Sequence, residues 1–149
     1  MTELSTTLRV LLANEFVAYF KAQTYHWNVE GINFPQYHEF FGDLYADFYG
    51  AIDPTAEYLR ILGEYTPVSL METYNYKTIS EDATQPTTLE QMLTNIGDAN
   101  QELISNLNKL FDVASSANEQ GIADWAAGRL DAHKKHAWMI RSSLKKSGE

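Results

Sequence analysis

Apolar side chains recur every three or four residues through most of this chain, in four long stretches. In the first stretch, Leu4, Leu8 and Leu12 lie on one side of a helix. This period is typical of helices that bury one face, and it differs from the alternation of a β-strand. We expect helices over residues 4–25, 35–62, 88–117 and 122–144. Since no strand pattern and no internal repeat stands out, an all-α fold is predicted.

Polar residues suited to helix capping mark several of these boundaries. Thr2 or Ser5 can begin the first helix, and Asn33 the second. Thr88 stands three residues before a glutamine, a capping-box pattern that begins the third helix. Pro54 falls inside the second helix, where it removes one backbone hydrogen bond. Because the apolar period continues past Pro54, we expect a local kink there and not the end of the helix.

The periodic pattern is lost between Gly63 and Thr88. This segment holds two prolines and five threonines, with a short helix expected near residues 69–74. A connection of this length is uncommon in a compact domain, but it can serve as a long crossover between two helices of a bundle. We therefore predict one domain over residues 1–149, a four-helix bundle with a crossover between its second and third helices.

Composition excludes several classes of function. The chain has 20 acidic and 11 basic residues, a formal net charge of −9 and no cysteine. Thiolate metal sites, iron–sulfur clusters and disulfides are excluded, and a general affinity for phosphate backbones is disfavoured. Cations are attracted instead. No apolar run is long enough to cross a membrane, and no signal-peptide pattern is present, so a cytoplasmic protein is expected.

Two pairs of residues carry donor groups suited to a metal ion. Asp53 and Glu57 are four residues apart in the expected second helix, so their carboxylates share one side of it. Two solvated surface acids are the alternative interpretation of that pair. His26 ends the first helix and His38 begins the second, and the turn between them, which includes Gly31, lets the two imidazoles approach each other. Structural histidines are the alternative here.

The two pairs are too far apart to act together within one chain. Asp53 follows His38 by 15 residues, which is roughly 22 Å along a continuous helix. One metal ion needs its donors within about 2.0–2.6 Å. Either the pairs are unrelated, or a twofold dimer with antiparallel second helices brings the histidines of one subunit to the acids of the other. Such donors suit Fe(II), Mn(II) or Zn(II) and leave positions open for water, peroxide or oxygen.

Around these residues the sequence resembles the signature of the Dps family, the ferritin-like mini-ferritins named as DNA-binding proteins from starved cells. The resembling positions are 25–34, 38–41, 45, 53–57, 131–133 and 137–139. The resemblance implies a ferritin-like four-helix bundle that assembles into a hollow dodecamer built from twofold dimers.

The resemblance also implies an activity and its residues. His26 and His38 of one subunit, with Asp53 and Glu57 of its dimer mate, would form a ferroxidase site that oxidises Fe(II) to Fe(III), usually with hydrogen peroxide. The shell would store the ferric mineral, contribute to iron homeostasis and protect against oxidative stress. Trp27 matches a family tryptophan proposed to quench stray oxidising equivalents, and interface packing is the alternative role for it.

Three positions depart from the family pattern. Gly42 stands where many relatives carry an acid four residues after the second histidine, so a second iron position lacks that ligand. Pro54 lies inside the Asp–Glu stretch and could shift its aspartate. Lys134 stands where many relatives place an acid in the last helix.

Four further residues of the last helix carry side chains that could bind a metal ion or line a pore. Asp124 and Asp131 are candidates for the acidic lining of the ion pores that the family has at its threefold axes, with surface acids as the alternative. His133 and His136 are three residues apart, and we expect them on the helix surface and not bound to a metal.

The family name also implies DNA binding, often through lysine-rich termini. Here no lysine precedes Lys21, and the chain carries a net charge of −9. We therefore expect weak or no DNA binding at neutral pH without bridging cations. The main hypothesis is an iron-oxidising storage shell. The alternatives are a metal-sequestering or DNA-protecting shell with a weakened ferroxidase site, and a bundle with a structural role alone.

Overall fold

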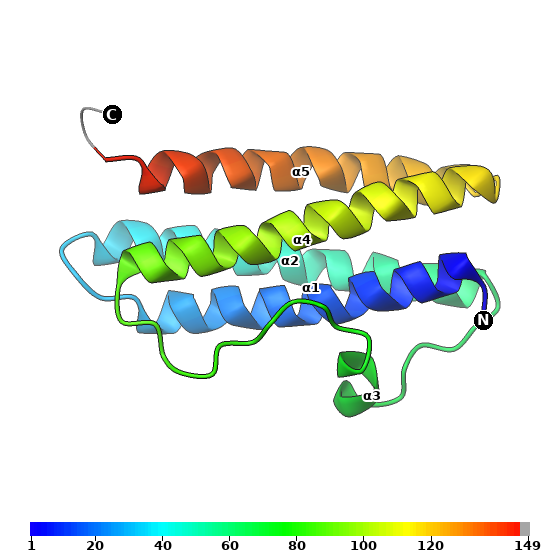
Figure 1. The fold of residues 1–149 in the computed structure, drawn as a ribbon, viewed down its shortest axis with the longest axis horizontal. Coiled ribbons are helices and arrows are strands. Elements are labelled where there is room, and N and C mark those ends of the chain that lie inside the picture. Colours follow the sequence, from blue (N-terminus) through cyan, green and yellow to red (C-terminus); the bar gives the residue numbers. More distant parts are fainter. Residues whose placement is uncertain (147–149) are drawn as a thin grey trace.

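The structure, a computed structural model, describes residues 1–146, and every regular element in that range is helical. The elements are α1 (Glu3–Asn28), α2 (Phe34–Ile61), α3 (Leu70–Tyr74), α4 (Leu89–Ser116) and α5 (Gln120–Leu144). The four long helices run side by side, and the short α3 lies outside them (Figure 1). The predicted all-α bundle with a short helix between its second and third long helices is confirmed.

The crossover between α2 and α4 follows from the order of the helices. α1 packs against α2 and α4, and α4 packs against α5. Figure 1 shows that α2 and α4 begin at the same end of the bundle, so the chain must return along its whole length. Buried Asn14 of α1 holds this return segment: its Oδ1 accepts hydrogen bonds from the amides of Thr78 and Ile79 at 2.9 and 3.0 Å.

The crossover is fixed to α1 a second time near the end of that helix. Asp82 accepts a hydrogen bond from the buried Lys21 ammonium at 2.9 Å and another from the Tyr25 hydroxyl at 2.5 Å. Burial, followed by the hydrogen bond to Asp82, raises the pKa of the Tyr25 phenol. These contacts order the segment next to the last turn of α1, where His26 lies.

Side-chain caps begin three of the helices. The Thr2 Oγ1 accepts a hydrogen bond from the Ser5 amide, so Thr2 is the N-cap of α1. Thr88 caps α4 in the same way, and Ser69 caps α3. Asn33 occupies the N-cap position of α2 but makes no side-chain hydrogen bond there, because its backbone has already turned from the extended conformation.

Pro54 does not end α2. The helix runs without interruption from Phe34 to Ile61 with Pro54 inside it, so the predicted continuity is confirmed. The local kink expected at Pro54 stays a prediction. The Thr55 hydroxyl lies 3.0 Å from the Ala51 carbonyl oxygen, which adds a side-chain contact beside the hydrogen bond that proline removes. The continuity of α2 fixes the separation between its two ends.

Leucine, isoleucine and aromatic side chains fill the space between the long helices. The largest fully buried side chains are Leu8, Leu11, Tyr25, Phe41, Leu44, Phe48, Leu59, Leu93, Ile96, Leu103, Leu107 and Leu110. Each contributes roughly 1.5–3 kcal/mol through removal of apolar surface from water. Among the described residues, no helix is long and apolar enough to cross a membrane.

A cluster of polar side chains lies inside the bundle between α2, α4 and α5. Arg129 donates hydrogen bonds of 2.9 and 2.8 Å to the Asp47 carboxylate, and His136 Nε2 lies 2.7 Å from the same group. His133 is only 2 % exposed, and its Nδ1 donates to Asn100 Oδ1 at 2.8 Å. The His136 side chain is 12 % exposed. The surface positions predicted for His133 and His136 are therefore wrong. Burial and the nearby Arg129 charge lower the pKa of His133 to about 3, so it is neutral at physiological pH.

Candidate metal centre

His26 and His38 meet where α1 turns into α2. The turn between the two helices uses Gly31, whose φ of 123° is favourable only for glycine. It places the two imidazole rings nearly parallel, with centroids 3.8 Å apart. The predicted approach of the two histidines is therefore seen in the structure.

Each imidazole is oriented by the backbone of the other residue. His26 Nδ1 lies 2.5 Å from the His38 carbonyl oxygen, and His38 Nδ1 lies 2.6 Å from the His26 carbonyl oxygen. A carbonyl oxygen can only accept, so both Nδ1 atoms must carry the proton. In the neutral ring the lone pair then resides on Nε2, the form in which histidine binds a metal ion. Both rings are thus prepared to bind through Nε2.

Aromatic and glycine neighbours surround this histidine pair. Phe34 stacks on His38 with ring centroids 5.0 Å apart, and the Tyr45 ring lies 5.3 Å from that of His26. Gly42 lies against the edge of His26 that carries Nδ1, where a Cβ would come within 3.1 Å of the imidazole Nδ1 and Cε1. Glycine at this position therefore leaves room for the His26 ring.

Asp53 and Glu57 lie one turn apart on the exposed side of α2. Between them, Thr55 is fully buried and donates a hydrogen bond of 3.0 Å to the carboxylate of Glu15. Burial raises the pKa of Glu15 well above its usual range, so this acid belongs to the interior of the bundle. The two exposed carboxylates, in contrast, face away from the core of their own subunit.

The histidine pair and the acid pair do not come together within one chain. His38 lies in the first turns of α2 and Asp53 lies 15 residues further along the same uninterrupted helix, a rise of roughly 22 Å. Within residues 1–146, no three histidine, aspartate or glutamate side chains converge as a metal site. Each pair therefore offers an incomplete set of donors.

Trp27 and the two pore candidates are all exposed. Trp27 is 57 % exposed and meets the ring of Phe20 edge-on, with centroids 6.4 Å apart. Asp124 and Asp131 are exposed on α5, two turns apart. Their solvent exposure fits a pore lining as well as an ordinary surface, so the pore role stays a prediction.

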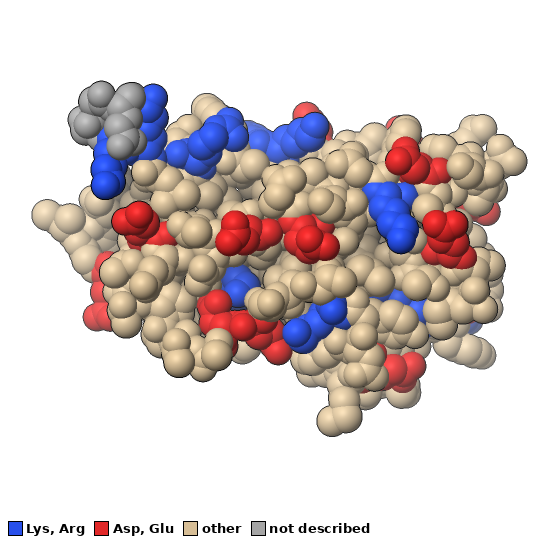
Figure 2. Space-filling model, in the orientation of Figure 1, with Lys and Arg blue, Asp and Glu red and all other residues tan. Residues whose placement is uncertain are grey.

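Charge is distributed unevenly over the surface. Figure 2 shows basic side chains gathered along α5 and acidic side chains over the neighbouring face. The exposed basic residues of the last helix and the turn after it include Lys134, Lys135, Arg141 and Lys145. Lys134 is therefore one of the exposed basic residues of this helix.

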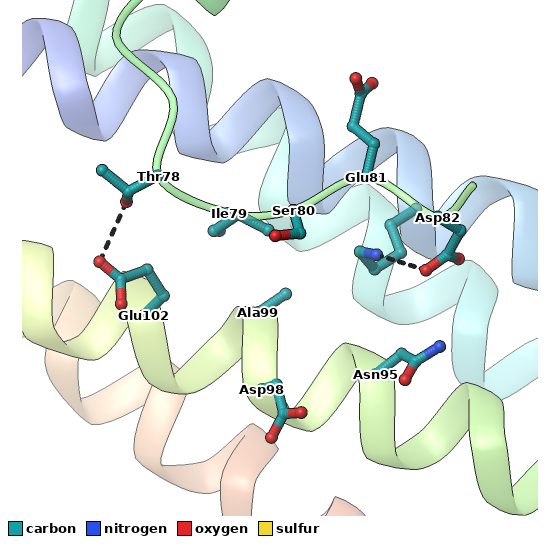
Figure 3. A pocket seen from close by; sticks show the side chains of 10 residues that line it. Thr78, Ile79, Ser80, Glu81, Asp82, Asn95, Asp98, Ala99 and Glu102 are labelled. Carbon is teal, nitrogen blue, oxygen red and sulfur yellow. Dashed lines mark hydrogen bonds and ion pairs between the residues drawn. The ribbon is translucent and has the colours of Figure 1, made fainter.

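A separate acidic pocket of about 320 Å³ lies between the crossover and α4 (Figure 3). Asp98 and Glu102 of α4 line it on one side and Asp82 of the crossover on the other. The Asp82 carboxylate is already paired with Lys21, and Glu102 accepts a hydrogen bond from Thr78. These pairings hold the crossover in place, and the pocket is not lined by either pair of candidate ligands.

Sequence reasoning missed the tyrosines next to the histidine pair. Tyr45 and Tyr49 lie one turn apart on α2, and the ring of Tyr19 from α1 contacts both of them. The signal available in the sequence is the spacing of seven residues from His38 to Tyr45, which places both on one face of a helix.

Comparisons with known proteins agree with this architecture. The family description "Ferritin-like domain" matches residues 6–147. A DNA protection during starvation protein of Brevibacillus brevis is 30 % identical over 147 residues, covering 96 % of this chain and 98 % of the relative. The X-ray structure of Dps from Thermosynechococcus elongatus has a TM-score of 0.94 at 25 % identity, covering 98 % of this chain and 92 % of that one.

A third comparison bears on the type of metal. The crystal structure of a Dps protein from Vibrio cholerae O1 has a TM-score of 0.91 at 25 % identity, covering 96 % of this chain and 89 % of that one. That protein is described as a member of a broad superfamily of ferritin-like diiron-carboxylate proteins. Iron is therefore the metal in the name of the superfamily to which that protein belongs.

Proposed function

Because the chain belongs to the Dps family of ferritin-like proteins, we propose that it oxidises Fe(II) to Fe(III) at sites shared between two subunits. His26 and His38 of one subunit and Asp53 and Glu57 of its dimer mate are the proposed ligands. The observation that carries the proposal is the pair of imidazoles, each fixed by the other's carbonyl oxygen with Nε2 left for a metal ion.

The incomplete donor sets explain why two subunits are needed. In a twofold dimer with antiparallel α2 helices, the histidine end of one helix lies beside the acid-bearing part of the other. The same symmetry creates the site twice. The uninterrupted α2 supports this arrangement, since it holds the histidines and acids of one chain at a fixed separation.

The chain's own groups suit the oxidation chemically. Two carboxylates stabilise Fe(III) more than Fe(II), because their attraction grows with the charge of the ion. Imidazole and carboxylate donors bind iron, and four protein ligands leave positions for hydrogen peroxide, the proposed oxidant, or for oxygen. The net charge of −9 attracts Fe(II) to the protein.

The proposed assembly is a hollow dodecamer that stores the ferric mineral and so protects the cell against oxidative damage. Asp124 and Asp131 are the proposed lining of its ion pores. Trp27 lies next to His26 in the chain and is largely exposed in the single subunit. It is proposed to quench stray oxidising equivalents, and its contact with Phe20 also suits packing at the dimer interface.

A metal-sequestering or DNA-protecting shell with a weakened site is the second candidate. Gly42 favours it, because it supplies no donor beside the histidine pair. The exposed basic strip of α5 favours contact with DNA, but the net charge of −9 opposes it. Tight metal binding without ferric absorbance after peroxide is added would select this second candidate.

Stopped-flow absorbance tests the proposed oxidation directly. Mixing the assembled protein with Fe(II) and then hydrogen peroxide should produce a ferric signal that is lost in His26→Ala and in Asp53→Ala. Asp112→Ala is the matched control, because it removes an exposed acid of α4 that belongs to neither ligand pair. A ferric signal that survives both ligand substitutions would contradict the assignment.

Mixed assemblies test whether the site is shared. One subunit carries His26→Ala and His38→Ala, and the other carries Asp53→Ala and Glu57→Ala. Neither variant should oxidise iron alone. A dimer of the two regains one complete site, formed by the histidines of the second subunit and the acids of the first. No recovery on mixing would show that the two pairs do not meet across the interface.

A further inference from the structure

Three tyrosine rings form a continuous row that begins at the histidine pair. The ring centroids of His26 and Tyr45 are 5.3 Å apart, those of Tyr45 and Tyr19 are 6.2 Å apart, and those of Tyr19 and Tyr49 are 5.0 Å apart. These separations are those of aromatic rings in contact. The row therefore connects the candidate iron ligands to a point further along α2 and two turns before His26 in α1.

The row leads toward the acid pair of the same chain. His38, Tyr45, Tyr49 and Asp53 follow one another at spacings of seven, four and four residues, so they lie on one face of α2. Tyr49 is one turn before Asp53. In the proposed dimer, that aspartate belongs to the second iron site, so the tyrosines occupy the space between the two sites.

Ring packing within one subunit does not require phenols at these three positions. Tyr19 and Tyr45 are only partly buried, and Tyr49 is 59 % exposed. Phenylalanine would provide the same ring contacts within the subunit. What a phenol adds is a hydroxyl group that can give up one electron together with one proton.

The reduction of hydrogen peroxide needs two electrons, whereas one Fe(II) supplies one. Resting on the ferroxidase function proposed above, we propose that Tyr45, Tyr19 and Tyr49 form an electron relay that supplies the second electron. The phenol then becomes a neutral phenoxyl radical, and its proton is released to water or to the reduced peroxide.

The electrons and atoms balance in two steps. In the first, Fe(II) becomes Fe(III), and a tyrosine loses one electron and one proton. The O–O bond of hydrogen peroxide takes both electrons and breaks, giving one hydroxide ion and, with the phenol proton, one water. In the second step, Fe(II) at the other site returns one electron to the phenoxyl radical, which takes a proton from solvent. Two Fe(II) are thus oxidised for each peroxide, and no hydroxyl radical is released.

Freeze-quench electron paramagnetic resonance tests the relay. The assembled protein is loaded anaerobically with one Fe(II) per subunit, mixed with hydrogen peroxide and frozen at short times. A transient phenoxyl signal is expected, and incorporation of ring-deuterated tyrosine should narrow it. The signal should be lost in the triple variant Tyr19→Phe, Tyr45→Phe, Tyr49→Phe. A spin trap should then detect more hydroxyl radical than in the unmodified protein.

Two controls separate the relay from folding and from iron binding. Tyr65→Phe removes a phenol that is 79 % exposed and lies beyond the far end of α2, and it should leave the signal unchanged. Binding of Co(II), which reports the iron ligands without redox chemistry, should be equal in the triple variant and the unmodified protein.

The possible failures are distinguishable. Iron oxidation without a phenoxyl signal, or with a signal that persists in the triple variant, would overturn the relay and leave the ferroxidase function standing. An absence of iron oxidation in the unmodified protein would overturn the ferroxidase function, and the relay with it.

Discussion

Substitution of Gly42 by alanine should weaken metal binding with little change in stability. The new Cβ would lie 3.1 Å from the His26 Nδ1 and Cε1 atoms, so the imidazole must move by a few tenths of an ångström. That movement disturbs the hydrogen bond from Nδ1 to the His38 carbonyl oxygen, which orients the ring. Loss of such an orienting contact typically lowers metal affinity by about 10- to 100-fold.

The effect on stability is the sum of two opposing terms. Replacing a helical glycine by alanine stabilises the helix by about 1 kcal/mol. The weakened hydrogen bond of His26 costs about 1 kcal/mol, so the free energy of unfolding should stay nearly constant. Gly50→Ala is the matched control: it lies in the same helix with no atom near the added Cβ. Gly50→Ala should raise the free energy of unfolding by the full amount of about 1 kcal/mol, and its metal affinity should equal that of the unmodified protein.

Co(II) titration followed by optical absorbance, together with urea denaturation at one protein concentration, measures both quantities. Gly42→Ala should separate from Gly50→Ala in affinity by at least about tenfold. If the two variants gain the same stability and bind Co(II) equally well, the close contact with His26 does not affect the orientation of its ring or its metal affinity.

Three other perturbations have defined outcomes. Asp82→Asn removes the negative charge facing buried Lys21 and weakens the bond to Tyr25, so it should destabilise the protein by about 2 kcal/mol and speed proteolysis of the crossover. His133 has a folded-state pKa of about 3 against 6.5 when unfolded. Because only the unfolded state binds its proton between these values, the free energy of unfolding should fall by up to about 1.4 kcal/mol per pH unit as the pH drops through that window. Urea denaturation at several pH values should show this slope, and a smaller slope in His133→Gln. In gel shifts at neutral pH and low salt, DNA should remain unbound until divalent cations are added, and tight binding without them would contradict the charge argument.

The helices were predictable because their apolar period is local information. Thr2 and Thr88 cap the helices that their sequence context predicts, and Pro54 is tolerated inside α2 as expected. The approach of His26 and His38 was also predictable, because only a short turn separates them.

The interior polar cluster could not be predicted in the same way. His133 precedes two lysines in the sequence, which suggests a solvated face. Its hydrogen-bond partner Asn100 belongs to another helix, 33 residues away. Burial of a polar side chain depends on such a distant partner, and periodicity within one helix carries no information about it. The row of tyrosines was missed for the same reason, since Tyr19 meets Tyr45 and Tyr49 across two helices.

The hydrogen bonds from the two imidazoles to main-chain oxygen atoms have an evolutionary consequence. Both acceptors are main-chain oxygen atoms, which every amino acid supplies, so no neighbouring side chain has to be retained to keep the rings in their metal-binding tautomer. Surrounding positions can therefore drift while the two histidines remain competent. What must be inherited intact is the turn that brings the two backbones together, including the glycine at its centre.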